Sequence, residues 1–147
     1  PQCDSIWVAE CSVDDQAGED LGFLMECLLE AGALDVYYTP IFMKKNRPAV
    51  HVTVLARKEE AELFRKLLFK HSTSFGFRER IESRSKLIKR KQRLNTESGE
   101  IEANIGLLNG EVLSVKAEYE DLKRLAQQAD CSLETVRREL YRNIDTL

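Results

Sequence analysis

Several residue types that build catalytic and metal centres are scarce in this chain of 147 residues. It holds one tryptophan, three prolines and two histidines, His51 and His71. A metal centre made of several imidazoles is therefore not expected from this chain alone. The sequence also lacks the GxxxxGK[ST], GxGxxG, HExxH and GxSxG motifs, so the common nucleotide loops, zinc proteases and serine hydrolases have no local signature here.

Long apolar runs and paired cysteines are missing as well. The apolar runs are short, as at Ile41–Met43, so no segment is expected to span a bilayer. No secretory signal stands at Pro1, and the missing initiator Met suggests a piece of a longer protein. The four cysteines form no CxxC pair, which predicts reduced thiols in a cytoplasmic protein.

Charge of one sign is not in large excess either. The chain has 22 Lys and Arg against 25 Asp and Glu, a net charge of −3. A protein that coats nucleic acid is therefore not expected. Hydrophobic residues make up 43% and charged residues 32%, the balance of a folded globular chain.

Residues 1–79 alternate between strand and helix patterns. Extended runs rich in β-branched residues alternate with two amphipathic stretches whose apolar positions recur every three or four residues. The predicted order is strand 6–11, helix 19–31, strand 34–42, strand 50–55, helix 58–70 and a strand entered through 72–78. This βαββαβ order predicts a ferredoxin-like lobe with two helices on one face of an antiparallel sheet.

Residues 80–147 predict a second, smaller lobe. Ile101–Leu107 alternates apolar with polar residues, and Asn109-Gly110 is a strong hairpin signal before Val112–Val115. Two amphipathic helices follow, one from Tyr119, the other capped by Ser132 and carrying Leu133, Val136, Leu140 and Ile144. The fold class is therefore α+β: a ferredoxin-like lobe followed by a β-meander and a helical pair.

Two charged turns could carry chemistry. Asp14-Asp15 follows the first strand; its carboxylates could cap the next helix or hold a divalent cation such as Mg²⁺ or Mn²⁺. Lys44-Lys45-Asn46-Arg47 places three cations in four residues. It could be a solvated hairpin tip, or it could bind phosphate, since a polyanion would cancel the mutual repulsion.

Weaker candidates lie elsewhere. Ser72-Thr73-Ser74 and Arg78 offer hydroxyls and a guanidinium to phosphate or nucleoside, although such clusters usually close turns. Glu118, Glu120 and Asp121 open a helix, where acids are expected for electrostatic reasons.

The segment 78–93 has eight bases and two acids, so it could contact nucleic acid. A sheet that reads single-stranded RNA stacks bases on aromatics in its central strands. The matching strands here contain one aromatic residue, Trp7, so RNA binding is less favoured. A charged edge strand that prevents sheet-to-sheet aggregation is the alternative that the pattern favours.

Several strings resemble one family. Residues 10–15 with Glu19 resemble its E-x-N-I-D-D…E segment, and residues 32–48 are close to G-A-L-D-V-x-x-T-P-I-x-M-K-K-N-R-P. Residues 72–78 resemble T-T-T-x-G-x-R, and residues 118–121 resemble the end of P-E-Y-E-D. The family is the nickel insertion proteins of nickel-pincer nucleotide biosynthesis (LarC), and the resemblance covers its C-terminal region.

The resemblance implies part of a CTP-dependent nickel cyclometallase of the lyase class. Such an enzyme inserts Ni²⁺ into pyridinium-3,5-bisthiocarboxylic acid mononucleotide and cleaves CTP to CMP and pyrophosphate. It also implies a CTP site with Mg²⁺ or Mn²⁺ in this region. The family's His-rich N-terminal region is not in this sequence, so complete activity is not expected from the chain alone.

The resulting hypothesis places the candidates in one nucleotide site. Its members Glu118, Tyr119 and Asp121 either contact the nucleoside or support the residues that do. Asp14 and Asp15 are assigned to the metal, and the phosphates to Lys44, Lys45, Asn46, Arg47, Ser72, Thr73, Ser74 and Arg78. A homo-oligomer without membrane or nucleic-acid partners is expected. The alternatives are a non-catalytic ferredoxin-like ligand-binding or assembly module and, less favoured, an RNA-binding domain.

Overall fold

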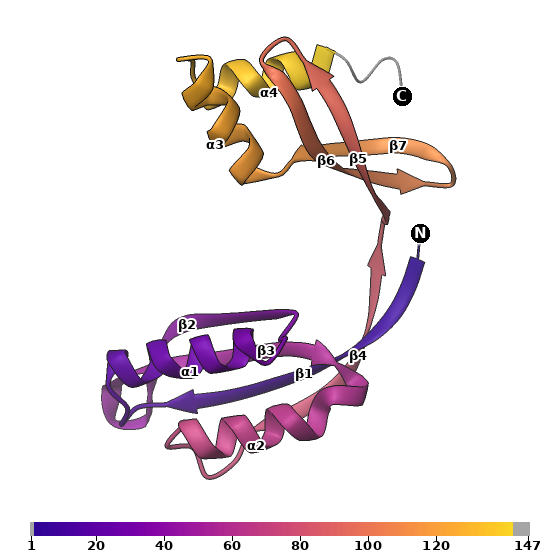
Figure 1. The fold of residues 1–147 in the computed structure, drawn as a ribbon. Coiled ribbons are helices and arrows are strands. Elements are labelled where there is room, and N and C mark those ends of the chain that lie inside the picture. Colours follow the sequence, from indigo (N-terminus) through magenta and orange to yellow (C-terminus); the bar gives the residue numbers. More distant parts are fainter. Residues whose placement is uncertain (1, 143–147) are drawn as a thin grey trace. The chain divides into compact units, whose positions relative to one another are not determined.

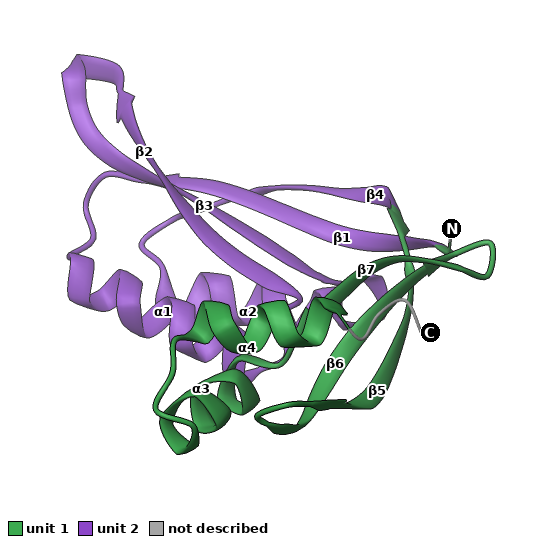
Figure 2. Ribbon diagram, turned by 90° about the horizontal axis from the view of Figure 1, so that it is seen from above, with its two compact units in different colours: residues 1–2, 85–147 green, residues 3–84 purple. Residues whose placement is uncertain are grey.

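The computed structural model describes residues 2–142, so Ile144 of the last predicted helix lies outside the described residues. The chain divides into two compact units, one of residues 3–84 and one that runs from Ser85 onward and includes Gln2 (Figure 2). Each unit has its own sheet, helices and core. The sequence-based boundary after residue 79 falls inside strand β4 (Arg78–Lys86).

The unit of residues 3–84 has the predicted ferredoxin-like order. Its sheet runs β2-β3-β1-β4, and α1 and α2 lie on the same face of it (Figures 1 and 2). The bounds are β1 Gln2–Val13, α1 Gly18–Glu30, β2 Asp35–Met43, β3 Arg47–Arg57, α2 Ala61–His71 and β4 Arg78–Lys86.

The core of this unit lies between the sheet and the two helices. β1 pairs antiparallel with β3, so that Ala9 faces Val54 and Cys11 faces Val52, and these side chains pack on Leu24 of α1 and Phe64 of α2. Trp7 also points into this layer; it is 1% exposed and stacks on Phe64 at 6.4 Å between ring centroids.

The second unit contains a three-stranded meander and a helical pair. The strands are ordered β5-β6-β7, and every neighbouring pair is antiparallel. Its core joins Ile101 and Ile105 of the central strand to Leu125, Val136 and Leu140 of the helices. The bounds are β5 Ile88–Thr96, β6 Gly99–Leu108, β7 Glu111–Ala117, α3 Tyr119–Gln128 and α4 Leu133–Arg142.

The predicted turns fold as their residues require. Asn109 and Gly110 have φ values of 53° and 90°, which a two-residue hairpin of this hand needs. The Ser132 hydroxyl accepts a hydrogen bond from the Thr135 amide at 3.1 Å, so the predicted cap of α4 is confirmed.

Two local predictions need correction. Lys58–Glu60 forms a 3₁₀ turn, and the α-helix that was expected to begin at Lys58 begins at Ala61. The basic segment 78–93, expected as one charged edge strand, is divided between β4 and a separate strand, β5. None of the described helices is long and apolar enough to cross a membrane.

Candidate functional site

Three loops of the 3–84 unit meet at one end of its sheet. They are the β1–α1 turn, the tip of the β2–β3 hairpin and the α2–β4 loop. Because β3 runs antiparallel to both β1 and β2, the last residues of β1 and the hairpin tip lie at the same end of the sheet. Helix α2 returns the chain to that edge, where the Gln16 amide nitrogen donates to the His71 carbonyl at 2.8 Å.

The hairpin tip contacts the first acidic turn directly. Arg47 Nη1 donates to Asp14 Oδ2 at 3.3 Å, and the two side chains are 54% and 20% exposed. The structure therefore brings a candidate phosphate residue and a candidate metal ligand together from positions 33 residues apart.

The hydroxyl loop contacts the second acid. Thr73 Oγ1 donates to Asp15 Oδ1 at 2.5 Å, and the Thr73 amide donates to Gln16 Oε1 at 3.1 Å. Gln16 thus bridges the two loops. Gln16 was not among the predicted site residues, because a glutamine next to two acids has no spacing that distinguishes it.

The two carboxylates do not cap the helix that follows them. The N-cap of α1 is Ala17, and no side chain makes a capping hydrogen bond there. The alternative that Asp14 and Asp15 cap this helix is therefore wrong, and their oxygens contact Arg47 and Thr73 instead.

Lys44 and Lys45 at the hairpin tip are exposed and have no acidic partner within residues 2–142. Lys45 and Asn46 have φ values of 61° and 55°, a left-handed conformation that costs a lysine energy. Unpaired cations on a fixed, strained backbone form a site that can accept an anion.

Two hydroxyls of the α2–β4 loop are used within the chain. The Ser72 hydroxyl donates to the Leu68 carbonyl at 2.7 Å, and the Ser74 hydroxyl donates to the Gly76 carbonyl at 2.6 Å. These bonds shape the loop, and Thr73 is the one of its three hydroxyls that reaches an acid.

Arg78 begins β4 on the open face of the sheet, where its guanidinium lies 3.9 Å from Glu10 Oε2. Arg80 holds the same carboxylate at 2.9 Å, and its hydrogen bonds keep the pKa of Glu10 below the usual range. Ser12 Oγ and His51 Nδ1 are 3.0 Å apart beside it. Glu10 was not among the predicted site residues, although it opens the first motif of the resemblance.

Glu118, Tyr119 and Asp121 belong to the other unit and make their contacts there. Asn104 Nδ2 donates to Glu118 Oε1 at 2.6 Å. Asp121 accepts the Glu102 amide at 2.8 Å, and Arg124 at 2.9 Å lowers the pKa of its carboxyl. The Tyr119 side chain is 57% exposed.

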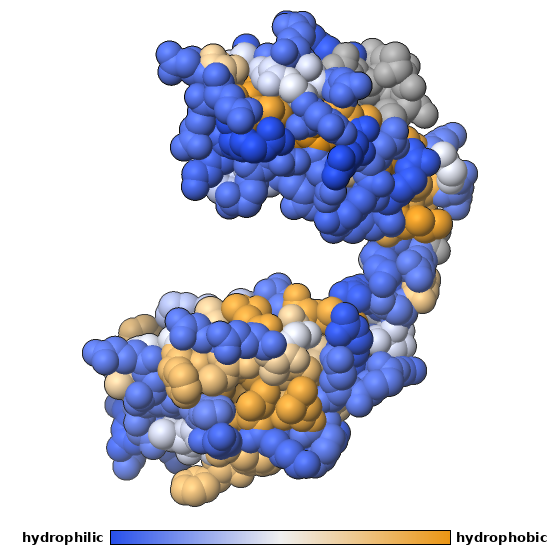
Figure 3. Space-filling view, viewed as in Figure 1, coloured by the Kyte–Doolittle hydropathy of each residue, from blue (hydrophilic) through white to orange (hydrophobic). Residues whose placement is uncertain are grey.

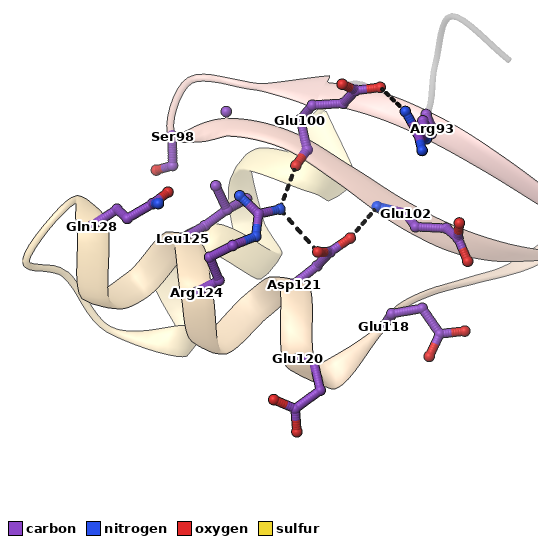
Figure 4. Close-up of a pocket in the computed structure, with 11 residues that line it drawn as sticks. Arg93, Ser98, Glu100, Glu102, Glu118, Glu120, Asp121, Arg124, Leu125 and Gln128 are labelled. Atoms are coloured by element: carbon purple, nitrogen blue, oxygen red, sulfur yellow. Dashed lines mark hydrogen bonds and ion pairs between the residues drawn. The ribbon is translucent and has the colours of Figure 1, made fainter.

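Glu118 and Asp121 line an open cavity of about 550 Å³ between β6 and α3 (Figure 4). Arg93 and Arg124 also line it, but they bond to Glu100 and Asp121 within the unit. These predicted nucleoside residues therefore lie in a different unit of the chain from Asp14 and Lys44.

A metal bound by protein groups alone has no site in the described chain. Residues 2–142 contain no group of three His, Cys, Asp or Glu side chains placed to hold one ion. Asp14 and Asp15 supply two carboxylates, which suits a cation that takes its other ligands from phosphate oxygens and water.

The basic segment 78–93 forms two edge strands, β4 and β5, one in each sheet. Four of its eight bases pair closely with acids on neighbouring strands: Arg80 with Glu10, Arg84 with Asp4, Lys91 with Glu102 and Arg93 with Glu100. The segment thus has the edge-strand arrangement that its pattern favoured.

Known proteins with similar sequences identify the family of this chain. The nickel insertion protein family matches residues 1–137. Proteins named pyridinium-3,5-bisthiocarboxylic acid mononucleotide nickel insertion protein are 43% identical over 139 residues in Thermotoga petrophila and 37% identical over 143 residues in Staphylococcus epidermidis. These matches cover 92% and 97% of this chain, which spans 34% and 36% of those relatives.

Solved structures agree. The apo form of LarC2, described as the C-terminal domain of a cyclometallase involved in the synthesis of the NPN cofactor of lactate racemase, superposes with a TM-score of 0.89 at 33% identity and covers 98% of this chain and 99% of that one. A Methanopyrus kandleri protein, 23% identical with a TM-score of 0.67 over 91% of this chain and 85% of that one, shares the fold. The chain therefore belongs to the nickel insertion protein family.

Proposed function

We propose that this chain is the nucleotide-binding region of a nickel insertion enzyme, and that it holds CTP with a divalent cation at the three-loop end of the 3–84 unit. The observation that carries the proposal is the meeting of acids and cations from separate loops. Arg47 lies 3.3 Å from Asp14, and the unpaired Lys44 and Lys45 stand on the same hairpin tip.

A triphosphate with its cation needs both kinds of charge in one place. Asp14 and Asp15 would hold Mg²⁺ or Mn²⁺, directly or through its waters, together with phosphate oxygens. The bound cation would neutralise phosphate charge. Because the Asp14 carboxylate also holds Arg47, the same acid would orient a guanidinium that can grip a phosphate with two parallel hydrogen bonds.

The chain's own residues would then act on the phosphates. Lys44, Lys45 and Arg47 would offset the charge that develops on pyrophosphate as it leaves. Asn46 would donate hydrogen bonds to phosphate oxygens, and the Thr73 hydroxyl would do the same once the cation replaces it at Asp15. The bonds of Ser72 and Ser74 within the loop hold it in shape. Arg78, 77% exposed at the start of β4, would contact the remaining phosphate or the ribose.

The wider role follows from what the relatives are named for. We propose that the longer protein inserts Ni²⁺, its substrate metal, into pyridinium-3,5-bisthiocarboxylic acid mononucleotide in a reaction of the lyase class that consumes CTP. The chain covers little more than a third of these relatives, so we expect nucleotide binding without complete turnover. The four cysteines are free, which fits work in the reducing cytoplasm.

Two other functions have weaker support. An RNA-binding sheet needs exposed aromatics on its central strands, but Trp7 is buried under the helices and donates to Glu79. A ligand-binding module without turnover would have no reason to place two acids at the cation-rich tip.

Calorimetric titration of the chain with CTP and Mn²⁺ tests the proposal. The Lys45→Glu/Arg47→Glu variant should bind CTP about a hundredfold more weakly, since each lost charged hydrogen bond costs about 1.5–3 kcal/mol and 1.4 kcal/mol is tenfold. Omitting Mn²⁺ should also weaken binding, because the cation joins Asp14 and Asp15 to the phosphates.

The matched control is Arg57→Glu/Lys58→Glu, which makes the same change of charge at the far end of β3. It should bind CTP like the parent. Equal affinity of the parent and the Lys45→Glu/Arg47→Glu variant would refute the site, and equal affinity for CTP and UTP with no need of Mn²⁺ would favour the module without turnover.

A further inference from the structure

A second, smaller cavity of the unit that begins at Ser85 lies where β7, α3 and α4 meet. Its volume is about 170 Å³, which suits one substituted aromatic ring, because pockets for larger ligands hold about 300–1,000 Å³. Leu122 and Leu140, 3% and 1% exposed, form an apolar part of its wall. Figure 3 shows a mostly hydrophilic surface on this unit, so a hollow with two leucines in its wall is a local exception.

Two tyrosines line the same cavity. Tyr119 of α3 and Tyr141 of α4 are 57% and 52% exposed. Tyr141 shares one face of α4 with Leu140 and Arg137, because residues three and four positions apart lie together on a helix. Within residues 2–142, neither tyrosine ring contacts another aromatic ring, and neither hydroxyl makes a hydrogen bond. Both rings and both hydroxyls therefore remain available to a flat ligand.

The charged residues of this cavity are bases. Lys116, near the end of β7, is exposed and has no acidic partner in the described part of the chain. Arg137 is 41% exposed and lies 3.7 Å from Glu134, which is too far for a hydrogen bond, so its guanidinium keeps its donors for a ligand. No acid stands among the described residues that line the cavity. The cavity therefore suits an anion.

The larger cavity of the same unit, between β6 and α3, has the opposite charge. Its two bases, Arg93 and Arg124, already lie beside acids, at 3.7 Å from Glu100 and 2.9 Å from Asp121. The acids that line it are Glu100, Glu102, Glu118, Glu120 and Asp121. An anionic ligand would be repelled there, so of these two cavities the smaller one fits an anionic aromatic ring.

We propose that the smaller cavity binds the pyridinium ring of the precursor mononucleotide, and that its two bases hold the anionic groups at ring positions 3 and 5. This inference rests on the proposed role of the longer protein in nickel insertion. It assigns the precursor to residues other than those of the CTP site, so the two sites can be tested separately.

The chemistry of the precursor ring matches the cavity group by group. Thiocarboxylates are ionised at neutral pH, so the ring carries two anionic groups beside its positive nitrogen. Lys116 can pair with one anion, and the Arg137 guanidinium can hold the other with two parallel hydrogen bonds. A cationic aromatic ring is attracted to the faces of Tyr119 and Tyr141. Because the cavity has room for the ring alone, the ribose and its phosphate extend from the mouth.

Calorimetric titration with two mononucleotides tests the assignment. The first ligand is pyridinium-3,5-bisthiocarboxylic acid mononucleotide. The second is nicotinamide mononucleotide, which has the same cationic ring, ribose and phosphate but a single neutral carboxamide. The parent chain should bind the first and should bind the second at least about tenfold more weakly, because the second lacks the anions for the two bases.

Two variants remove the two kinds of contact. Lys116→Glu/Arg137→Glu should bind the bisthiocarboxylic acid mononucleotide about a hundredfold more weakly, since each charged hydrogen bond is worth about tenfold or more. Tyr119→Leu/Tyr141→Leu keeps apolar side chains at the cavity and should weaken binding about tenfold through the loss of both ring faces. If one variant loses the circular dichroism spectrum of the parent, the other decides.

The matched control is Lys123→Glu/Arg138→Glu. It makes the same change of charge on α3 and α4 at residues that do not line the cavity, and Arg138, like Arg137, lies beside Glu134, at 3.6 Å. This control should bind the bisthiocarboxylic acid mononucleotide like the parent. All three variants should bind CTP with Mn²⁺ like the parent, because none of them changes the three-loop end.

The outcomes separate this inference from the nucleotide site. A parent chain that binds CTP but not the bisthiocarboxylic acid mononucleotide would overturn the inference alone, and so would equal affinities of the parent and a folded Lys116→Glu/Arg137→Glu variant for that ligand. Loss of its binding in Lys45→Glu/Arg47→Glu would move the precursor to the hairpin tip and also overturn the inference. Precursor binding as described in a chain that does not bind CTP would support the inference and refute the nucleotide site.

Discussion

The two most basic segments of the chain differ in how their cations pair with acids. Residues 78–93 carry eight bases, but they form edge strands in which Arg80, Arg84 and Arg93 lie beside acids of the neighbouring strands, at 2.8 Å for Arg84 and Asp4. The hairpin tip carries only Lys44, Lys45 and Arg47, and within residues 2–142 Asp14 is the one acid that contacts it.

The comparison shows that pairing distinguishes a binding site better than the number of charges does. A paired cation stabilises the fold and is already satisfied, whereas an unpaired cation on a constrained backbone still has its hydrogen bonds to give. Three measurements test this contrast between paired and unpaired cations.

Acid should destabilise the 3–84 unit most, since it removes several pairs together. Arg80 lowers the pKa of Glu10, and Arg65, then Trp7, lower that of Glu79. A carboxyl with a lowered folded pKa stabilises the fold above its unfolded pKa, and that stability is lost as pH falls through the folded value. The free energy of unfolding should therefore decline as the pH falls below 4.5, the ordinary pKa of a glutamate carboxyl.

Urea unfolding at several pH values, followed by the fluorescence of the single tryptophan, Trp7, measures this decline. Glu10→Gln should be less stable than the parent at neutral pH and should converge with it in acid. Glu59→Gln, which changes a carboxyl 68% exposed and 3.8 Å from Lys58, should follow the parent curve. A constant gap between Glu10→Gln and the parent would show that pairing with Arg80 does not cause the decline.

Removing one paired arginine should have an intermediate effect. Arg84 donates to both carboxylate oxygens of Asp4, at 3.0 and 2.8 Å, and both side chains are about one-third exposed. Arg84→Ala should cost about 1 kcal/mol of unfolding free energy, because solvent weakens a charged pair at this exposure.

The control for this prediction is Arg57→Ala. Arg57 contacts Glu60 within one turn at 3.3 Å, and it is 59% exposed, so its loss should stay within about 0.5 kcal/mol. Equal losses for Arg84→Ala and Arg57→Ala would mean that the paired edge strand stabilises no more than an ordinary surface contact.

Much of the fold could be predicted from the sequence, because its signals are local. The apolar repeat of Leu21, Leu24 and Leu28 and the alternation of Val52 and Val54 give the correct elements and the buried faces. The division of the basic segment into β4 and a separate strand β5 could not be predicted, because β5 is largely polar and exposed and lacks the alternation by which strands are found.

The candidate site was predictable where topology decides it. Once the βαββαβ order is fixed, the end of β1, the hairpin tip and the start of β4 meet at one edge, and Asp14, Arg47 and Thr73 follow. The roles of Gln16 and Glu10 depend on which side chains face each other across loops and strands, as with Arg80 and Glu10 at positions 70 residues apart. Sequence patterns do not show which residues of two distant segments lie opposite each other.

The smallest change in stability should come from the hairpin tip. Lys44 has no acidic partner among the described residues and stands beside Lys45, so Lys44→Ala removes repulsion and no ion pair. Its unfolding free energy should stay within about 0.5 kcal/mol of the parent, while CTP affinity in Mn²⁺ should fall about tenfold. Arg84→Ala should do the reverse, losing stability and keeping affinity. If Lys44→Ala instead loses stability and binds CTP normally, its charge serves the fold, and the distinction between paired and unpaired cations fails at the position where it matters most.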